Sequence, residues 1–329
     1  MEMPFSPADE RLVILSDQHK GACDGADDFQ RCERSYNAAL TYYERLGYRL
    51  ILLGDVEELW ENSFEEVSVS YPETLALEAK FISDDPSSNR YTRVWGNHDL
   101  AWSDAELFRE QMEKHGAGGV EPVEAVRLLV GGPEGGRPKE LLLAHGHQGT
   151  DDSDRNAWTS RFFVRRGWRW LQRRLNRPWN TPAVDWGLRG QHAELMYEWA
   201  LDEHAVLIAG HTHLPVFFHS QKEMPPAGET PSPADTAGDE DEAQALAQAR
   251  QEWLTAERRR LARQKPIELD VPCYFNTGCC SFGDGDITGI ELREGQIRLV
   301  RWPSEPNLTP EVLAAMDLSE VFELVEAAR

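Results

Sequence analysis

The chain has 329 residues, a formal net charge of −23 and a hydrophobic share of 40%. The length allows one large domain or two ordinary ones. The negative charge argues against nucleic acid as a partner, so any affinity for phosphate must be local. No apolar run of about 18 residues is present, which argues against a membrane-spanning helix. The N-terminal residues lack a signal-peptide pattern and the cysteines form no CxxC pair, so we expect a cytoplasmic protein with reduced thiols.

Short apolar runs recur along the chain, and each ends in a cluster of Asp, Asn or His. They are RLVILSDQH (11–19), RLILLGDVEE (49–58), RVWGNHD (93–99), ELLLAHGHQ (140–148) and AVLIAGHTH (205–213). Continuous apolar runs of this length predict strands that are buried on both faces. Apolar residues at helical spacing predict helices at 28–46, 187–204 and 309–327. Alternating strands and helices indicate an α/β fold, in which ligands gather at the carboxyl ends of the strands.

The last third of the chain differs in composition from the rest. Residues 274–302 contain strand-like pieces and a predicted hairpin at REGQ (293–296). Before them, residues 220–265 are predicted to be an acidic, mobile insertion, rich in Pro, Gly and Ala. Its second part, from residue 239, is expected to form one charged helix, acidic at its start and basic at its end. We expect no catalytic role for this insertion.

Residues 155–177 contain eight arginines and no acidic residue, interleaved with aromatic residues. One interpretation is an amphipathic helix whose arginines face water while its aromatic residues join the core. The other is a basic cap for an anionic substrate with an apolar part, or a peripheral contact with the inner face of a membrane. In that case the arginines expected to bind substrate are Arg155, Arg161, Arg165 and Arg169.

The polar clusters contain the ligand types of a transition-metal site. Residues spaced as Asp-x-His or His-x-His at a strand end point to one side, because alternate strand residues face the same way. Taken singly, each candidate ligand is better explained as a turn residue or as a core histidine whose hydrogen bonds are made within the protein. Together, imidazole and carboxylate suit Mn²⁺, Fe or Zn²⁺. There are more candidate ligands than one metal needs, which favours a two-metal site with a shared carboxylate.

The ordered set D-x-H, G-D, G-N-H-D, H and G-H-T-H resembles the calcineurin-like metallophosphoesterases over residues 11–213, and NTG at 276–278 extends the resemblance to about 302. The resemblance implies an α/β fold, a four-layer αββα sandwich of two mixed sheets flanked by helices. It further implies a single domain over 1–329, with a helical cap insertion at 150–185. The implied cofactors are two divalent metal ions, Mn²⁺ being expected first and Fe or Zn²⁺ as alternatives.

The same resemblance assigns the ligands. Those of the first metal are Asp17, His19 and His213; Asp55 bridges; those of the second are Asn97, His145 and His211. His147 is the alternative ligand at this place. We prefer His145 because it directly follows the apolar strand. We expect His98 to face the bound phosphate, stabilising charge or protonating the leaving oxygen, with Glu58 orienting it. Asp99 is expected to cap the turn after the strand.

The segment GDVEELW (54–60) and the Arg-rich insertion are similar to the UDP-2,3-diacylglucosamine diphosphatase branch of this family. This chain departs from that branch at His98, where the branch carries Arg, and at HGH (145–147), where it carries HGD. A hydrolase of phosphodiester or pyrophosphate bonds in a nucleotide-sugar or lipid-linked substrate is therefore the first hypothesis. A phosphatase or nucleotidase for soluble phosphate esters or phosphoproteins is the second, which His98 favours. A non-enzymatic metal-bound scaffold is the third, and it would require a lost ligand.

Overall fold

The computed structural model describes residues 1–83, 85, 88–114, 120–131, 138–147, 186–218, 269–305 and 308–328. The chain divides into two compact units, Met1–Phe218 with Val271–Arg329, and His219–Asp270. All elements and contacts below belong to the first unit. The predicted cap at 150–185 and the predicted insertion at 220–265 lie outside the described residues. So do the arginines expected to bind substrate, Arg155, Arg161, Arg165 and Arg169.

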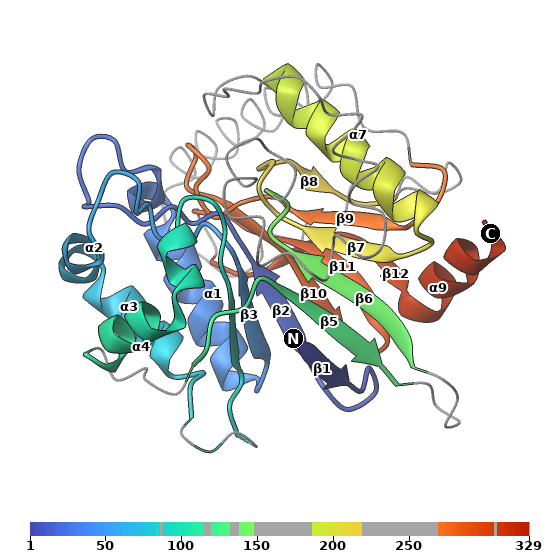
Figure 1. The fold of residues 1–329 in the computed structure, drawn as a ribbon, viewed down its shortest axis with the longest axis horizontal. Coiled ribbons are helices and arrows are strands. Elements are labelled where there is room, and N and C mark those ends of the chain that lie inside the picture. Colours follow the sequence, from blue (N-terminus) through green and yellow to red (C-terminus); the bar gives the residue numbers. More distant parts are fainter. Residues whose placement is uncertain are drawn as a thin grey trace, which may run out of the picture. The chain divides into compact units, whose positions relative to one another are not determined.

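Two mixed β-sheets form the centre of this unit (Figure 1). The first sheet has the order β1 (Glu2–Phe5), β5 (Ala125–Val130), β6 (Lys139–Ala144), β7 (Val206–Ala209), β9 (Tyr274–Thr277) and β8 (Pro215–Val216). The second has the order β12 (Glu311–Asp317), β11 (Gln296–Trp302), β10 (Ile287–Arg293), β2 (Leu12–Leu15), β3 (Arg49–Leu53) and β4 (Tyr91–Val94). β2, β3 and β4 are parallel neighbours, as are β6, β7 and β9.

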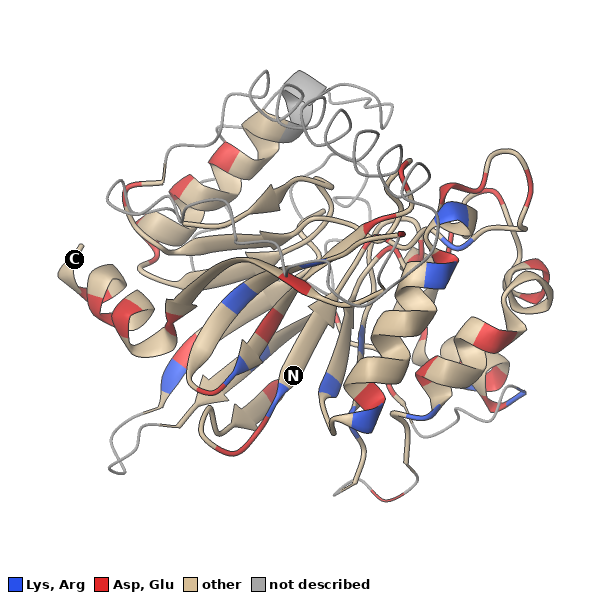
Figure 2. Cartoon of the chain, turned by 180° about the vertical axis from the view of Figure 1, so that it is seen from behind, with Lys and Arg blue, Asp and Glu red and all other residues tan. Residues whose placement is uncertain are grey.

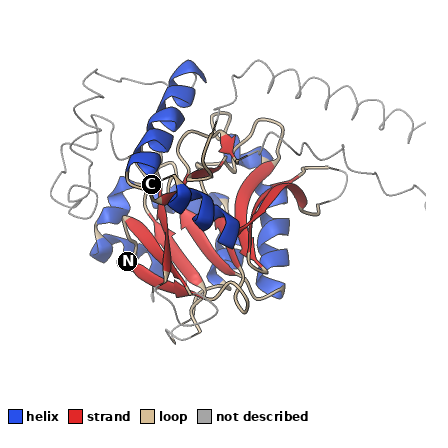
Figure 3. Cartoon of the chain, turned by 90° about the vertical axis from the view of Figure 1, so that its right-hand side faces the viewer, coloured by secondary structure: helices blue, strands red, loops and turns tan. Residues whose placement is uncertain are grey.

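Helices lie on both outer sides of the sheets (Figure 3). They are α1 (Glu33–Arg45), α2 (Phe64–Ser70), α3 (Pro72–Ala79), α4 (Ala105–Glu113), α7 (Trp186–Asp202) and α9 (Leu318–Ala327). Two short 3₁₀ helices precede α1 and α4, namely η1 (Asp28–Arg31) and η2 (Leu100–Ser103). α1 packs on β3 and β11 of the second sheet, and α7 packs on β9 of the first. The predicted α/β architecture of two mixed sheets flanked by helices is confirmed.

Sequence periodicity accounts for these positions. The strands β2 and β7, LVIL and VLIA, are buried at every residue, as expected for strands covered on both faces. In α1, the side chains of Tyr36, Ala39, Leu40 and Tyr43 are fully buried, at the three- and four-residue spacing of one helix face. They join one apolar core with the second sheet. Leu46, the last residue of the predicted helix 28–46, follows α1 and is partly buried.

The predicted helix at 309–327 is wrong in its first half. Residues Glu311–Asp317 form β12, which pairs antiparallel with β11 and continues directly into α9. Ala, Leu and Met are good helix formers, so local preference favours a helix here. The open edge of β11 instead supplies backbone partners, and sheet pairing overrides the local preference. The predicted hairpin is confirmed, since Glu294 (φ 53°) and Gly295 (φ 75°) form the two-residue turn between β10 and β11.

The charge of the described helices is mainly negative (Figure 2). Every charged residue of α2, α3 and α9 is acidic. Among the described helices, none has the length and hydropathy needed to cross a membrane.

Candidate metal centre

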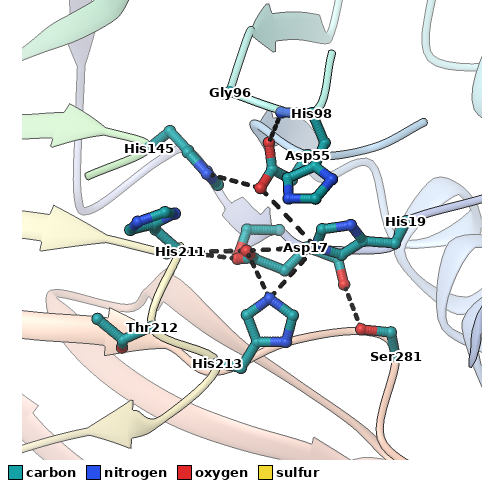
Figure 4. A network of polar contacts seen from close by, with 12 residues as sticks. Asp17, His19, Asp55, Gly96, His98, His145, His211, Thr212, His213 and Ser281 are labelled. Carbon is teal, nitrogen blue, oxygen red and sulfur yellow. Dashed lines mark hydrogen bonds and ion pairs between the residues drawn. The ribbon is translucent and has the colours of Figure 1, made fainter. Parts of the chain in front are cut away.

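The predicted metal ligands meet where strands of both sheets end (Figure 4). Asp17 and His19 follow β2, Asp55 follows β3, and Asn97 and His98 follow β4, all in the second sheet. The first sheet contributes the remaining histidines, which follow β6 and β7, namely His145, His211 and His213. The carboxyl ends of parallel strands thus converge on one place, as expected for ligand sites of α/β folds.

The backbone at this place is unusual. A positive φ is uncommon for residues other than glycine and costs about 1–3 kcal/mol each. Here it occurs at Asp17 (56°), His19 (50°), Asp55 (51°), His211 (66°) and His213 (55°). Hydrogen bonds between neighbouring loops hold these conformations: the amide of Asp17 donates to the carbonyl of Gly54 (3.1 Å), and that of His19 to the carbonyl of Asp55 (2.9 Å). The left-handed turns direct the side chains of these residues toward one another.

Asp17, His19 and His213 form a first group whose possible ligand atoms all lie within 4.8 Å of one another. The Nε2 atoms of His19 and His213 are 3.2 Å apart, and His213 Nε2 lies 3.3 Å from Asp17 Oδ1. His19 Nδ1 donates to Glu58 Oε2 (3.0 Å), which leaves the lone pair of the neutral ring on Nε2. Two imidazole nitrogens and a carboxylate oxygen thus point at one position, as ligands of a cation do.

Asp55, His145 and His211 form a second such group. His145 Nε2 lies 3.0 Å from Asp55 Oδ2. Its Nδ1 lies 2.8 Å from the carbonyl oxygen of Leu53, which can only accept, so Nδ1 carries the proton and Nε2 can be a ligand. Within the described part of the chain, no group hydrogen-bonds to the buried Oδ1 of Asn97. A buried amide oxygen without a hydrogen-bond donor fits a site that would hold a cation.

Asp55 lies between the two groups. Its Oδ2 is 3.0 Å from His145 Nε2 and 3.7 Å from His19 Nε2. Its other oxygen accepts from the backbone amide of His98 (2.8 Å), and the carboxylate of Asp17 accepts from the amide of His211 (2.9 Å to Oδ2). Each carboxylate is therefore oriented by the loop of a different strand.

The electrostatics of the cluster favour added positive charge. Burial would raise the pKa of the Asp17 and Asp55 carboxyls, but neighbouring histidines, chiefly His213 for Asp17 and His145 for Asp55, hold it below the ordinary value. Burial would likewise lower the pKa of His145, but Asp55 and Asp17 raise it to about 9. Two buried carboxylates that draw a proton onto a buried imidazole form an environment suited to divalent cations.

His98 and Glu58, the predicted pair beside the metals, are in contact. His98 Nδ1 lies 2.6 Å from Glu58 Oε2, the same oxygen that accepts from His19. Burial would raise the pKa of Glu58, but the hydrogen bonds from His19 and His98 lower it to about 2, so the carboxylate is charged. Among the residues that the structure describes, Glu58 is the hydrogen-bond partner of the His98 ring through Nδ1, and Nε2 is not part of this contact. By distance alone, His98 could also join a third ligand group with His19 and Asp55.

The sequence from residue 10 to residue 215 matches the family model described as calcineurin-like phosphoesterase. The chain belongs to this family. Its members are dimetal-dependent enzymes, and the clustered Asp and His residues here are candidate ligands, so this calcineurin-like protein is a metal-dependent phosphoester hydrolase. The family resemblance of the ordered motifs is thereby confirmed.

Several solved structures resemble this calcineurin-like chain over most of its length. A predicted phosphoesterase from Streptococcus pneumoniae TIGR4 has 12% identity and a TM-score of 0.32, covering 92% of this chain and 97% of that one. Vacuolar Protein Sorting 29 from Cryptosporidium parvum has 13% identity and a TM-score of 0.34, with 94% and 97% covered. A dimetal phosphatase from Danio rerio has 9% identity and a TM-score of 0.41, with 93% and 98% covered. Comparison with curated proteins finds no match.

Glycines make room for the side chains of the calcineurin-like site. A Cβ on Gly54 would lie 2.5 Å from Cγ of His145, one on Gly96 2.6 Å from the backbone nitrogen of Asp55, and one on Gly210 2.6 Å from Asp17 Oδ2. Gly54 also has a positive φ of 86°. At Gly96, a glycine is needed because Asp55 lies so close that no Cβ would fit, and not because the backbone has an unusual φ.

His147 and Asp99 lie close to the site but outside the ligand groups. His147 is buried beside His145 and Trp95, with ring centroids 5.4 Å from each, and burial followed by the charge on His145 lowers its pKa to about 3. Asp99 was expected to cap the turn that follows β4. It does so by accepting from the amide of Gly96 within that turn, and it also accepts from the amide of Val56 (2.9 Å), which joins the loops after β3 and β4; it makes no capping bond to η2.

Supporting residues of the calcineurin-like centre also escaped the sequence analysis. Asn276, noted only as the first residue of NTG (276–278), donates to the carbonyl of Gly210 (2.7 Å) and so holds the loop of His211 and His213. His192 of α7 reaches the carbonyl of Gly146 (2.8 Å) and lies beside His211. The NTG motif was the available signal for Asn276, whereas nothing in the sequence distinguishes His192 from an ordinary helix residue.

Proposed function

We propose that the protein hydrolyses a phosphodiester or pyrophosphate bond at two divalent cations that share Asp55. The observation that carries this proposal is the position of the buried Asp55 carboxylate, whose Oδ2 lies 3.0 Å from His145 Nε2 of the second group and 3.7 Å from His19 Nε2 of the first. The residues that would hold the first cation are Asp17, His19, His213 and Asp55. Those that would hold the second are Asp55, Asn97, His145 and His211. Mixed imidazole and oxygen donors suit Mn²⁺, with Fe and Zn²⁺ as the other candidates.

When bound, the cations would neutralise charge on the phosphoryl oxygens and generate a nucleophile from water. The contribution of His98 follows from its contacts. Its Nδ1 is bonded to the charged Glu58, and its Nε2 is left for substrate. In the protonated ring, Nε2 would donate to the leaving oxygen and so stabilise the charge that develops as the P–O bond breaks. Glu58 stabilises that cation and fixes the ring plane.

For the substrate, we propose a nucleotide-sugar or lipid-linked diphosphate, similar to that of UDP-2,3-diacylglucosamine diphosphatases. Support comes from the sequence of 54–60 and from the Arg-rich residues 155–177. Arg155, Arg161, Arg165 and Arg169 would then bind the anionic part of the substrate, and the aromatic residues between them its apolar part. In this proposal the 150–185 insertion acts as a cap on a single domain.

The second candidate function is a phosphatase or nucleotidase for soluble phosphate esters. The observation that favours it is the Glu58–His98 contact at 2.6 Å. A histidine at this place that is held by a carboxylate can protonate a poor leaving group, which an arginine cannot do, since it remains charged in proteins.

A substrate panel with Mn²⁺ tests both candidates. It compares UDP-diacylglucosamine, other nucleotide diphosphates, bis-p-nitrophenyl phosphate and simple monoesters, with Asp55→Asn as the inactive reference and Asp9→Asn, an exposed change, as the control. Preference for diphosphates or diesters supports the first function, and preference for monoesters supports the second. Absence of turnover on every substrate with Mn²⁺, Fe²⁺ and Zn²⁺ would contradict both and favour the scaffold hypothesis.

A further inference from the structure

Trp60 is an exposed aromatic residue that stacks on His98. The two rings are nearly parallel, at an angle of 24°, with their centroids 3.9 Å apart. Trp60 is 59% exposed, and it is the only aromatic residue among the exposed large hydrophobic side chains of the described chain. A tryptophan in the core would be buried. Trp60 therefore contributes little to the core, and its packing partner is a residue of the metal centre.

The backbone fixes Trp60 in this position. The amide of its neighbour Leu59 donates to the carbonyl of His98 (3.1 Å), which joins the loops after β3 and β4. On the other side, Asn62 donates to the carbonyl of Glu58 through its backbone amide (3.2 Å) and its side chain (3.1 Å). The short segment from Glu58 to Asn62 thus carries both a hydrogen-bond partner of the His98 ring and a stacking partner.

These contacts restrain the His98 ring in complementary ways. Glu58 holds Nδ1, which by itself allows the ring to rotate about the axis of that hydrogen bond. Trp60 covers one face of the ring and opposes this rotation, and His19 meets the ring edge-on with centroids 4.6 Å apart. The contacts leave Nε2 available to substrate.

We propose that Trp60 is a positioning residue for His98, keeping Nε2 directed at the leaving oxygen. This inference rests on the proposed function, in which His98 acts at the leaving group. A direct contact between Trp60 and substrate is the competing explanation for its exposure. The two differ in one respect: a positioning residue has no effect once His98 is removed, whereas a substrate contact keeps its effect.

A double-mutant cycle of Trp60→Ala and His98→Ala separates them. Aromatic stacking of this kind corresponds to about a 3- to 10-fold effect on rate, so Trp60→Ala should lower kcat by this factor and leave KM nearly unchanged. Trp60→Phe, which retains a stacking ring, should restore most of the loss. In the His98→Ala background, Trp60→Ala should have less than about a 2-fold effect. Val69→Ala, at an exposed residue of α2, is the matched surface control. Equal effects of Trp60→Ala in both backgrounds, or an effect on KM alone, would overturn the proposal.

NMR of histidine labelled with ¹³C at Cε1 provides a readout that needs no turnover. An indole ring stacked at 3.9 Å shifts the signal of the His98 proton bonded to Cε1 upfield. Trp60→Ala should therefore move this signal downfield, and Trp60→Phe should move it less than Trp60→Ala does. His98→Ala assigns the signal. If the wild type hydrolysed no phosphoester, the proposed function would fail, yet this measurement would still decide whether Trp60 holds the His98 ring. A His98 signal unchanged by Trp60→Ala would overturn it.

Discussion

Glu58 Oε2 lies 2.6 Å from Nδ1 of His98, and the same oxygen lies 3.0 Å from Nδ1 of His19. One carboxylate thus connects a proposed metal ligand with the proposed acid. Glu58→Gln would keep the size of the side chain but remove the charge that accepts both bonds. Because loss of an outer partner of a ligand histidine typically costs about 10- to 100-fold in metal affinity or activity, we expect a fall in kcat of this order. We also expect weaker metal binding, measured by titration of the apo-protein.

Glu61→Gln is the control for this change, since Glu61 lies in the same loop and is exposed. It should leave both quantities at the wild-type level. A Glu58→Gln enzyme with normal kcat and normal metal affinity would show that the shared carboxylate has no functional role.

Metal content tests the bridging role of Asp55 separately from the role of His98. Asp55→Asn removes the charged oxygen that lies near His145 of the second ligand group and His19 of the first, so the metal content by elemental analysis should fall by about half or more. His98→Ala should lose activity but keep its metals, because we assign His98 to the leaving group although its distances also allow a ligand role. Loss of metal in His98→Ala would assign that residue to the metal centre instead.

The ordered motifs predicted the location of this centre because each motif is a short segment of sequence, a buried strand that ends in a polar turn. Contacts between motifs were less accessible. The expected pairing of Glu58 with His98 came from family resemblance, whereas the additional bond to His19 depends on the left-handed turn at His19. Residues Glu311–Asp317 were predicted as helix because their local preference is helical. They form a strand because they pair with the open edge of β11, and no sequence motif indicates this pairing. The partners of the buried Arg93 were equally inaccessible, since Glu57 and Asp99 belong to the loops after β3 and β4.

Gly96→Ala should disturb the centre without changing any polar group. The added Cβ would lie 2.6 Å from the backbone nitrogen of Asp55 and would contact its carboxylate even more closely, so the loop after β3 or β4 must move. Overpacking of this kind costs about 1–3 kcal/mol of stability, and displacement of Asp55 should lower the metal content. Gly25→Ala is the matched control, because nothing lies within 4 Å of a Cβ at that position and its φ is not positive. Denaturant unfolding and elemental analysis of both variants check the expectation.

Arg93 connects the loops of the site through a buried charge network. Its guanidinium contacts Glu57 and lies 2.7 Å from Asp99 Oδ2, and Lys20 Nζ lies 3.3 Å from Glu57 Oε1. Burial would raise the pKa of Glu57, but Arg93 and Lys20 lower it to about 2. Arg93→Met would leave two carboxylates with less compensation in the interior, which typically costs about 3–5 kcal/mol.

Urea unfolding followed by circular dichroism measures this loss as a lower midpoint with an unchanged m-value. Arg109→Met is the control, since Arg109 is exposed and pairs with the exposed Glu113 at 4.0 Å, a kind of contact worth about 0–1 kcal/mol. An Arg93→Met variant as stable as Arg109→Met would show that the network contributes no net stability.

Glu291 of β10 gives the fold a pH dependence of defined sign. Burial raises the pKa of its carboxyl, although the hydrogen bond from Tyr43 (2.8 Å) and the charges of Arg293 and Arg298 act in the opposite direction. The folded state therefore binds this proton more tightly than the unfolded state, so stability falls as the pH rises from the ordinary carboxyl pKa through the raised value. Glu291→Gln keeps an acceptor for Tyr43 and cannot ionise, so this loss should disappear.

The measurement is the free energy of unfolding of wild type and variants between about pH 4 and pH 8. Glu291→Gln should resemble the wild type at the acidic end and gain relative stability as the pH rises through that window, after which the difference stays constant. Glu294 on the same hairpin is the control of opposite sign, because the hydrogen bond from Arg293 lowers its pKa. For Glu294→Gln, any relative change on raising the pH should be a loss, since the charged form is favoured in the folded state. A Glu291→Gln variant that loses stability with rising pH would mean that Tyr43, Arg293 and Arg298 outweigh the burial of this carboxylate.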